Sequence, residues 1–319
     1  MPTSRRDVLE RRQSKKRRGF ALLIVIWGLG VVILLMTSFM ATARLRLRGA
    51  VDNSSAIRAR LVAQGAVNLA ILGLLAEQNA ADPSKAETTA HDGAPRICTL
   101  AGALVAISIE DESGKLDLNA ASSALIEATL RGFGVGDAGR LARAIVSFRE
   151  AQTSEIARLT APPPSSERPF APKHAPFQTA SELDQVDGME PRLMRALLPI
   201  ATVHAHGVGV DPRAAPPALF AALARYPAAE ALALAARPFP NGLDRRDPRF
   251  PPEFRQSVVA AGTYSIHAEA ALSNGAIGVE ETIVALRPNE RLPFTIVESK
   301  RAPARSRELI GAGATAPPC

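Results

Sequence analysis

The 319-residue sequence contains few cysteines and few aromatic residues. Its two cysteines, Cys98 and Cys319, are too few for a disulfide framework or a cysteine-rich zinc site, although they can pair with each other in an oxidising compartment. The G-x-S-x-G signature of many hydrolases is absent. His204 and His206 could bind a metal, but they have no third ligand nearby and are predicted to be surface residues. We therefore expect neither an enzyme nor a metalloprotein.

Charged residues are absent from Gly19 to Ala43. Within this stretch, Phe20 to Met40 contains only Thr37 and Ser38 as polar residues. As a helix this segment would be about 31 Å long, close to the roughly 30 Å thickness of a bilayer core. The sequence predicts a transmembrane helix.

The residues before this helix are strongly basic. Residues 1–18 carry eight Arg or Lys side chains against Asp7 and Glu10. Six of the seven net positive charges thus belong to the leader, and a chain beginning at Phe20 carries only +1. By the positive-inside rule, the leader is expected to stay in the cytoplasm and the rest of the chain to be exported.

The junction Arg17-Arg18-Gly19-Phe20 resembles a type IV prepilin signal. The resemblance implies that prepilin peptidase cuts between Gly19 and Phe20 and that Phe20 is then N-methylated. Such proteins usually have Glu at the fifth mature position, which here is Ile24.

Apolar residues beyond the membrane segment recur at helical spacing at Ile57, Leu61, Leu69, Leu72 and Leu75, which predicts that the helix continues to about Glu77. This apolar stripe is an expected contact surface for neighbouring subunits. A strand is predicted from Leu104 to Glu110. The acidic residues 110–112 that follow are interpreted as a solvent-exposed turn, with a calcium site as the weaker alternative.

A helical block is predicted next. Asn119 is the expected N-cap of a helix through Leu130, the glycine-rich residues 132–136 form a hairpin, and a second helix runs to Phe148. This is a helix-hairpin-helix-like (SAM-like) unit. The match of 134–139 to G-x-G-x-x-G does not indicate a dinucleotide site, because a helix rather than a strand precedes it.

A second unit of this kind follows a proline-rich linker. Ser181 is expected to cap its first helix and Pro191 to begin its second. Helices are also predicted from Pro217 to Leu223 and from Ala228 to Ala236. Strands at 258–272, 276–286 and 292–298 then form an antiparallel meander that pairs with 104–110.

The predicted fold class is α+β, with a pilin-like N-terminal helix on an antiparallel sheet and an inserted all-α domain. The expected segments are a cleaved leader (1–19), a transmembrane half-helix (20–43), a first pilin-like part (44–112), the insert (113–250), a second pilin-like part (251–300) and a flexible tail (301–319).

Several segments resemble general secretion pathway protein K of type II secretion, a family that also lacks the fifth-position Glu. They are 18–24 (RGFALLI), 110–119 (EDESGKLDLN), 181–189 (SELDQVDGM) and 210–216 (VDPRAAP). The resemblance implies a non-catalytic minor pseudopilin at the tip of the periplasmic pseudopilus, anchored in the inner membrane. Its implied partners are other minor pseudopilins, the inner-membrane platform and prepilin peptidase, and also the secreted substrate or the outer-membrane secretin.

One segment departs from the family pattern. The family has an acid-rich stretch linked to calcium after the first helical unit, whereas this chain has 147–155 (SFREAQTSE), with Arg149 among few carboxylates. No cofactor is therefore expected, calcium included.

The alternative function is a membrane-anchored DNA receptor of the competence type. Helix-hairpin-helix units can bind phosphates, and Arg131, Arg140 and Arg143 lie near the first hairpin. Asp187 and Glu190 at the second hairpin would repel phosphate, so no nucleic acid is expected.

Overall fold

The computed structural model describes residues 5–78, 91–150, 173–237, 247–256, 262–287, 290–306 and 316–319, with side chains from Phe20 onward. The chain divides into two units, residues 1–57 and 58–319. Helix α1 (Arg5–Gln78) makes up the described part of the first unit and continues into the second. Its end agrees with the predicted end near Glu77, and its start shows that the described leader residues are also helical.

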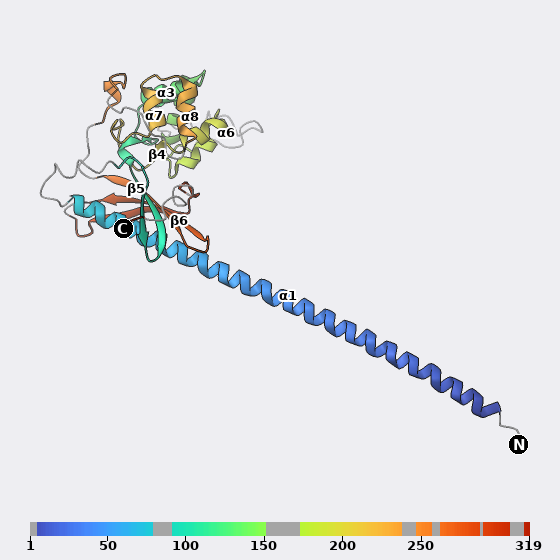
Figure 1. The fold of residues 1–319 in the computed structure, drawn as a ribbon. Helices are drawn as coiled ribbons and strands as arrows, with labels where there is room; N and C mark the ends of the chain where they lie inside the picture. Colours follow the sequence, from blue (N-terminus) through green and yellow to red (C-terminus); the bar gives the residue numbers. More distant parts are fainter. Residues whose placement is uncertain are drawn as a thin grey trace. The chain divides into compact units, whose positions relative to one another are not determined.

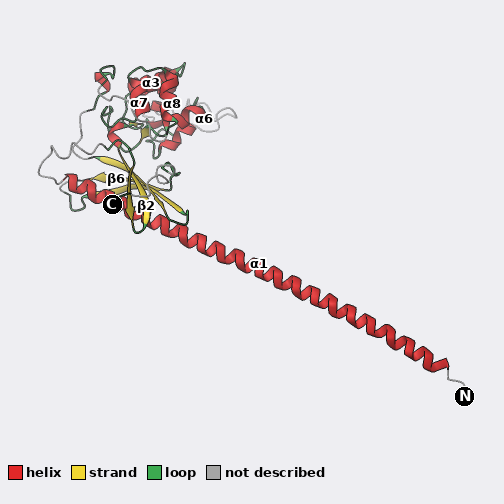
Figure 2. Ribbon diagram, in the orientation of Figure 1, coloured by secondary structure: helices red, strands yellow, loops and turns green. Residues whose placement is uncertain are grey.

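Five antiparallel strands form the main sheet, shown in yellow in Figure 2. Their order is β1-β2-β5-β6-β7, with bounds β1 (Arg96–Leu100), β2 (Ala103–Asp111), β5 (Thr263–Ala271), β6 (Ile277–Leu286) and β7 (Phe294–Lys300). The predicted meander is confirmed, and β2 pairs with β5 as expected. Strand β1 was not predicted, since its five residues are too few to show clear alternation.

The C-terminal part of α1 packs on one face of this sheet through small and branched residues. Buried side chains of α1 share one core with residues of β2, β5 and β6, namely Val62, Ala63, Ala66, Val67, Ala70, Ile71 and Leu74 with Val105, Ile266, Ala268 and Val284. The contact is close, because a Cβ on Gly278 would lie 2.3 Å from the carbonyl carbon of Ala59. Bulky side chains would not fit at such a separation.

Most of the predicted apolar stripe therefore does not face the sheet, although Leu75 is partly buried against this core. Ile57, Leu61 and Leu72 are each more than half exposed, and Leu69 is 39% exposed. The helix buries its alanine-rich side and leaves most of the leucine side open, which keeps the stripe available as a contact surface.

The helical domain lies between β2 and β5 in sequence and has its own hydrophobic core. Figure 1 shows α3, α6, α7 and α8 gathered in one block. Its elements are η1 (Glu112–Gly114), β3 (Leu116–Asp117), α3 (Ser123–Gly132), α4 (Ala138–Arg149), η2 (Ala180–Gln185), α6 (Pro191–Leu197), β4 (Ala201–Thr202), α7 (Pro217–Leu223), α8 (Ala228–Ala235) and η3 (Pro252–Phe254). Strands β3 and β4 pair in parallel. The predicted starts at Pro191, Pro217 and Ala228 are confirmed.

Two predicted helix caps are wrong. Ser122, not Asn119, caps α3 by accepting a hydrogen bond from the Leu125 N–H. The Asn119 side chain instead binds both backbone groups of Phe177, at 2.7 and 2.9 Å, and so ties the first helical unit to the second. The first helix of the second unit is the short 3-10 helix η2, which has no side-chain cap.

The C-terminal tail, expected to be flexible, contacts the sheet at both of its described ends. Near its start, the backbone N–H groups of Arg305 and Ser306 donate to the Glu269 carboxylate. At its end, Cys319 forms a disulfide with Cys98 of β1. The tail is thereby held against β5 and β1.

Candidate functional site

The first candidate region is the apolar segment of α1. Phe20–Gln78 contains a window of mean hydropathy 2.7, long and apolar enough to cross a membrane by length and composition. Most large side chains between Phe20 and Met40 are open to the surroundings, for example 50% exposed at Val32, 54% at Ile24 and 77% at Phe39. Thr37 donates its hydroxyl to the backbone carbonyls of Ile33 and Leu34, so this polar group is satisfied inside the helix.

The predicted processing site lies within the same continuous helix. Gly19 and Phe20 are both residues of α1. Ile24 stands where the resemblance would place a Glu, and no acidic residue occurs between Glu10 and Asp52 to take its place. Cleavage between Gly19 and Phe20 and methylation of Phe20 stay predictions.

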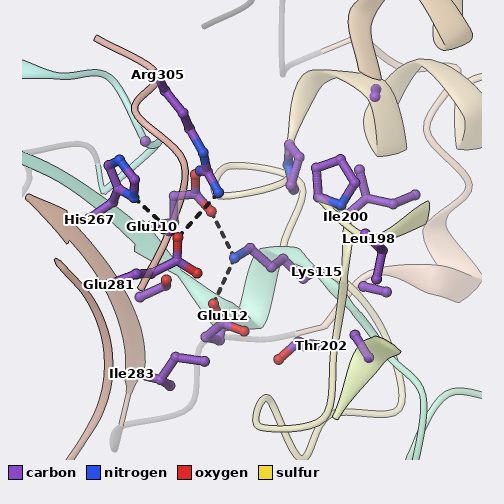
Figure 3. Close-up of a pocket in the computed structure, with 18 of the residues that line it drawn as sticks. Glu110, Glu112, Lys115, Leu198, Ile200, Thr202, His267, Glu281, Ile283 and Arg305 are labelled. Atoms are coloured by element: carbon purple, nitrogen blue, oxygen red, sulfur yellow. Dashed lines mark hydrogen bonds and ion pairs between the residues drawn. The ribbon is translucent and has the colours of Figure 1, made fainter. Parts of the chain in front are cut away.

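The second candidate region lies where β2 enters the helical domain. The acidic residues here were expected to be solvent-exposed, but Glu112 is 1% exposed and packs beside the buried Lys115. The Lys115 ammonium lies 2.7 Å from carboxylate oxygens of both Glu110 and Glu112 (Figure 3). One buried cation thus pairs with two carboxylates. The sequence could have indicated this ion pair, since Lys115 lies within five residues of Glu110. The burial of Lys115, however, depends on the tertiary fold.

These contacts perturb the titration of the cluster. Burial alone would lower the pKa of Lys115, but Glu110 and Glu112 more than offset it and raise the net pKa. Burial alone would raise the pKa of Glu110, and Lys115 more than offsets that effect and lowers it. Glu110 and Lys115 are therefore held in their charged forms.

A second ionic network lies on the same face of the sheet. His267, on β5, is within hydrogen-bond distance of Glu269 (2.9 Å) and Glu281 (3.1 Å). Arg305 of the tail donates to Glu281 at 3.2 Å, a contact drawn in Figure 3. Burial alone would raise the pKa of Glu281, but the hydrogen bond from His267 and the charges of Arg305 and Lys300 lower it to about 2.

A cavity of about 670 Å³ separates this face from the helical domain and is lined by both. The sheet contributes Glu281 and Ile283, and the helical domain contributes Ile200 and Thr202 (Figure 3). His204 crosses the gap and lies 3.2 Å from Glu298 of β7, so it is not the surface residue that was expected. The His204–Glu298 contact thus links the helical domain directly to the sheet.

The segment that departs from the calcium-linked pattern of the family contains the guanidinium group of Arg149. Arg149, at the end of α4, donates to the backbone carbonyls of Leu118 at 2.7 Å and Ala121 at 2.8 Å. A cationic side chain beside these oxygens does not suit a divalent cation. No group of three or more His, Cys, Asp or Glu side chains among the described residues is placed to hold a metal. Residues 151–155 of the departing segment lie outside those described.

Basic side chains near the first hairpin form ion pairs with carboxylates. Arg131 is paired with Glu127. Arg140 is paired with Asp137 at 3.1 Å and lies 3.9 Å from Asp187 of the second unit. Two of the three candidate phosphate ligands thus already have carboxylate partners.

Comparison with known proteins gives a match among solved structures. No family model matches the sequence, and no curated protein matches it. Among solved structures, the chain is similar to a chain in the crystal structure of the GspK-GspI-GspJ complex from the type 2 secretion system of enterotoxigenic Escherichia coli, with a TM-score of 0.53. The two are 17% identical, and the match covers 81% of this chain and 100% of the other. The chain therefore has the predicted pilin-like α+β fold.

Proposed function

We propose that the chain is a minor pseudopilin of a type II secretion system, a structural component that assists export of folded proteins across the outer membrane. The observation that carries the proposal is the GspK-like fold over 81% of the chain. It is supported by the apolar segment from Phe20 and the Arg-Arg-Gly-Phe junction directly before it.

The absence of an acidic residue at Ile24 supports a place at the tip of the pseudopilus. In a filament of such helices, a carboxylate at this position neutralises the terminal ammonium of the next subunit outward, since an unpaired charge in an apolar core is costly. A subunit with Ile24 cannot do this for a neighbour beyond it. It is tolerated as the last subunit but not inside the filament.

The same proposal gives the location and the partners. The basic leader stays in the cytoplasm, the segment Phe20 to Met40 spans the inner membrane, and the rest lies in the periplasm. Other minor pseudopilins pack against the exposed stripe of α1, for which Ile57, Leu61 and Leu72 provide apolar contact area. The chain itself performs no catalysis.

Processing of the full-length chain in cells with and without prepilin peptidase tests the proposal. We expect a shorter product only with the peptidase, beginning at N-methylated Phe20 by mass spectrometry. Gly19→Leu should abolish the shift and Ile24→Glu should leave it intact. Gly28→Leu is the matched control, because Gly28 has open space around it in the same helix. Unchanged gel mobility in both strains would contradict the proposal.

A further inference from the structure

The chain closes one edge of its main sheet and leaves the other open. The edge strands are β1 and β7. At β1, the Thr99 N–H donates to the Pro317 carbonyl at 2.7 Å and the Cys319 N–H donates to the Thr99 carbonyl at 3.1 Å. The Cys98–Cys319 disulfide fixes this arrangement. The last residues of the chain thus occupy the β1 edge.

Strand β7 has no such cover among the described residues. Apart from its ladder with β6, none of their backbone hydrogen bonds involves residues 294–300. Glu298 pairs with Ile283 and Ile296 pairs with Val284, so Val297 is an extra, bulged residue. Ile296 is 52% exposed and Val297 is 46% exposed. Exposed edge strands are usually blunted by charged side chains or bulges. In β7 the charged residues Glu298 and Lys300 lie at the C-terminal end and pair with each other at 3.3 Å, and residues 294–297 on the other side of the bulge are uncharged.

Basic side chains flank this uncharged stretch. Arg291 and Arg301 are both exposed, and neither forms an ion pair with any described residue. In an extended chain they are about 33 Å apart. The edge therefore combines free backbone groups, an apolar middle and a positive charge at each end.

We propose that β7 binds an extended segment of another protein by strand addition, and that this segment is apolar in its middle and acidic at both ends. Backbone hydrogen bonds supply affinity in this mode of recognition, and side chains supply specificity. The charges argue against a second copy of this chain, because antiparallel pairing centred on Ile296 would place Arg291 opposite Arg301 twice. Like charges directly opposite each other destabilise a strand pair.

The test uses the full-length protein in detergent and two synthetic peptides. Each peptide alternates Thr and Val between two terminal charged residues spaced like Arg291 and Arg301, with Glu at both ends in one and Lys in the other. We expect the Glu peptide to bind at least about ten-fold more tightly by fluorescence anisotropy, which corresponds to about 1.4 kcal/mol. It should also slow hydrogen exchange of the amides at 294–300.

Two variants locate the binding site. Val297→Lys places a charge in the middle of the edge and should abolish binding of the Glu peptide. Val208→Lys, which changes a 73% exposed valine of the helical domain, should leave it unchanged. The proposal would be overturned if both peptides bound equally, or if the Glu peptide bound without slowing hydrogen exchange at 294–300. It would also be overturned if self-association of the protein slowed exchange at 294–300 in the absence of peptide. None of these outcomes depends on leader processing, so a failure here is distinguishable from a failure of the proposed function.

Discussion

Replacing Lys115 with Met should strongly destabilise the part of the chain formed by residues 58–319, because two carboxylates would lose their shared cation. The Glu112 side chain is 2% exposed and that of Glu110 is 31% exposed. Removing one partner of a buried ion pair costs about 3–5 kcal/mol. The share of Glu110 is smaller, since solvent screens a partly exposed charge. We therefore expect a loss of about 3 kcal/mol, most of it from Glu112.

The loss should also depend on pH. In the wild type, the lowered pKa of Glu110 contributes stability above its unfolded-state pKa, and this is lost as the pH falls through the folded-state value. In Lys115→Met the sign reverses, because burial without a cation favours the neutral carboxyl group. Protonation of the buried carboxyl group then removes part of the cost in the variant. The loss in its free energy of unfolding should therefore be smaller at pH 5 than at pH 8.

Pulse proteolysis of the detergent-solubilised protein across a urea gradient measures this effect. With an m-value of about 3 kcal/mol/M, the expected loss lowers the urea midpoint by about 1 M at pH 8. The double variant Glu112→Gln/Lys115→Met should recover at least half of the shift, because it no longer buries the Glu112 charge. A midpoint within about 0.3 M of the wild type, or equal deficits at pH 5 and pH 8, would refute the reasoning.

Two further predictions concern the tail and its contacts. Cys98→Ser should lower the free energy of unfolding by about 2–5 kcal/mol, because the lost disulfide closes a long loop with a sequence separation of 221; a reductant should cause the same loss in the wild type and none in the variant. Burial alone would lower the pKa of His267, but hydrogen bonds to Glu269 and Glu281 raise it. Its stabilisation is therefore complete below pH about 6.5 and is lost as the pH rises through the raised folded-state pKa. His267→Gln should flatten this decline of stability with pH, measured as urea midpoints at a series of pH values. Parallel pH profiles for wild type and variant would contradict this role of His267.

Local signals in the sequence were sufficient for most helices and strands. Pro191 and Pro217 begin helices because their fixed φ suits the first turn. The strands β2, β5 and β6 alternate because one face packs on α1 and the other faces the ionic networks. Each of these signals acts within a few residues, so a single sequence reveals it.

Features set by distant partners could not be predicted in the same way. Leu61 and Leu72 form an obvious stripe, yet α1 buries its alanines because Gly278 lets the helix approach β6 closely. Glu112 reads as a solvated acid until the helical domain covers it and Lys115. Asn119 is a good cap by type, but Phe177, 58 residues away, takes its hydrogen bonds. In each case tertiary packing outweighs the local preference.

The helical domain differs from α1 and β7 in how its large apolar side chains are exposed. Among the described residues of the helical domain, Leu198 and Val208 are the large hydrophobic side chains that are clearly exposed. Helix α1, by contrast, exposes many, and the short strand β7 exposes the two adjacent residues Ile296 and Val297. Contiguous apolar exposure marks contact surfaces, so we expect assembly contacts on α1 and β7. A helical domain with few exposed large apolar side chains agrees with the proposed place of the chain at the end of a filament.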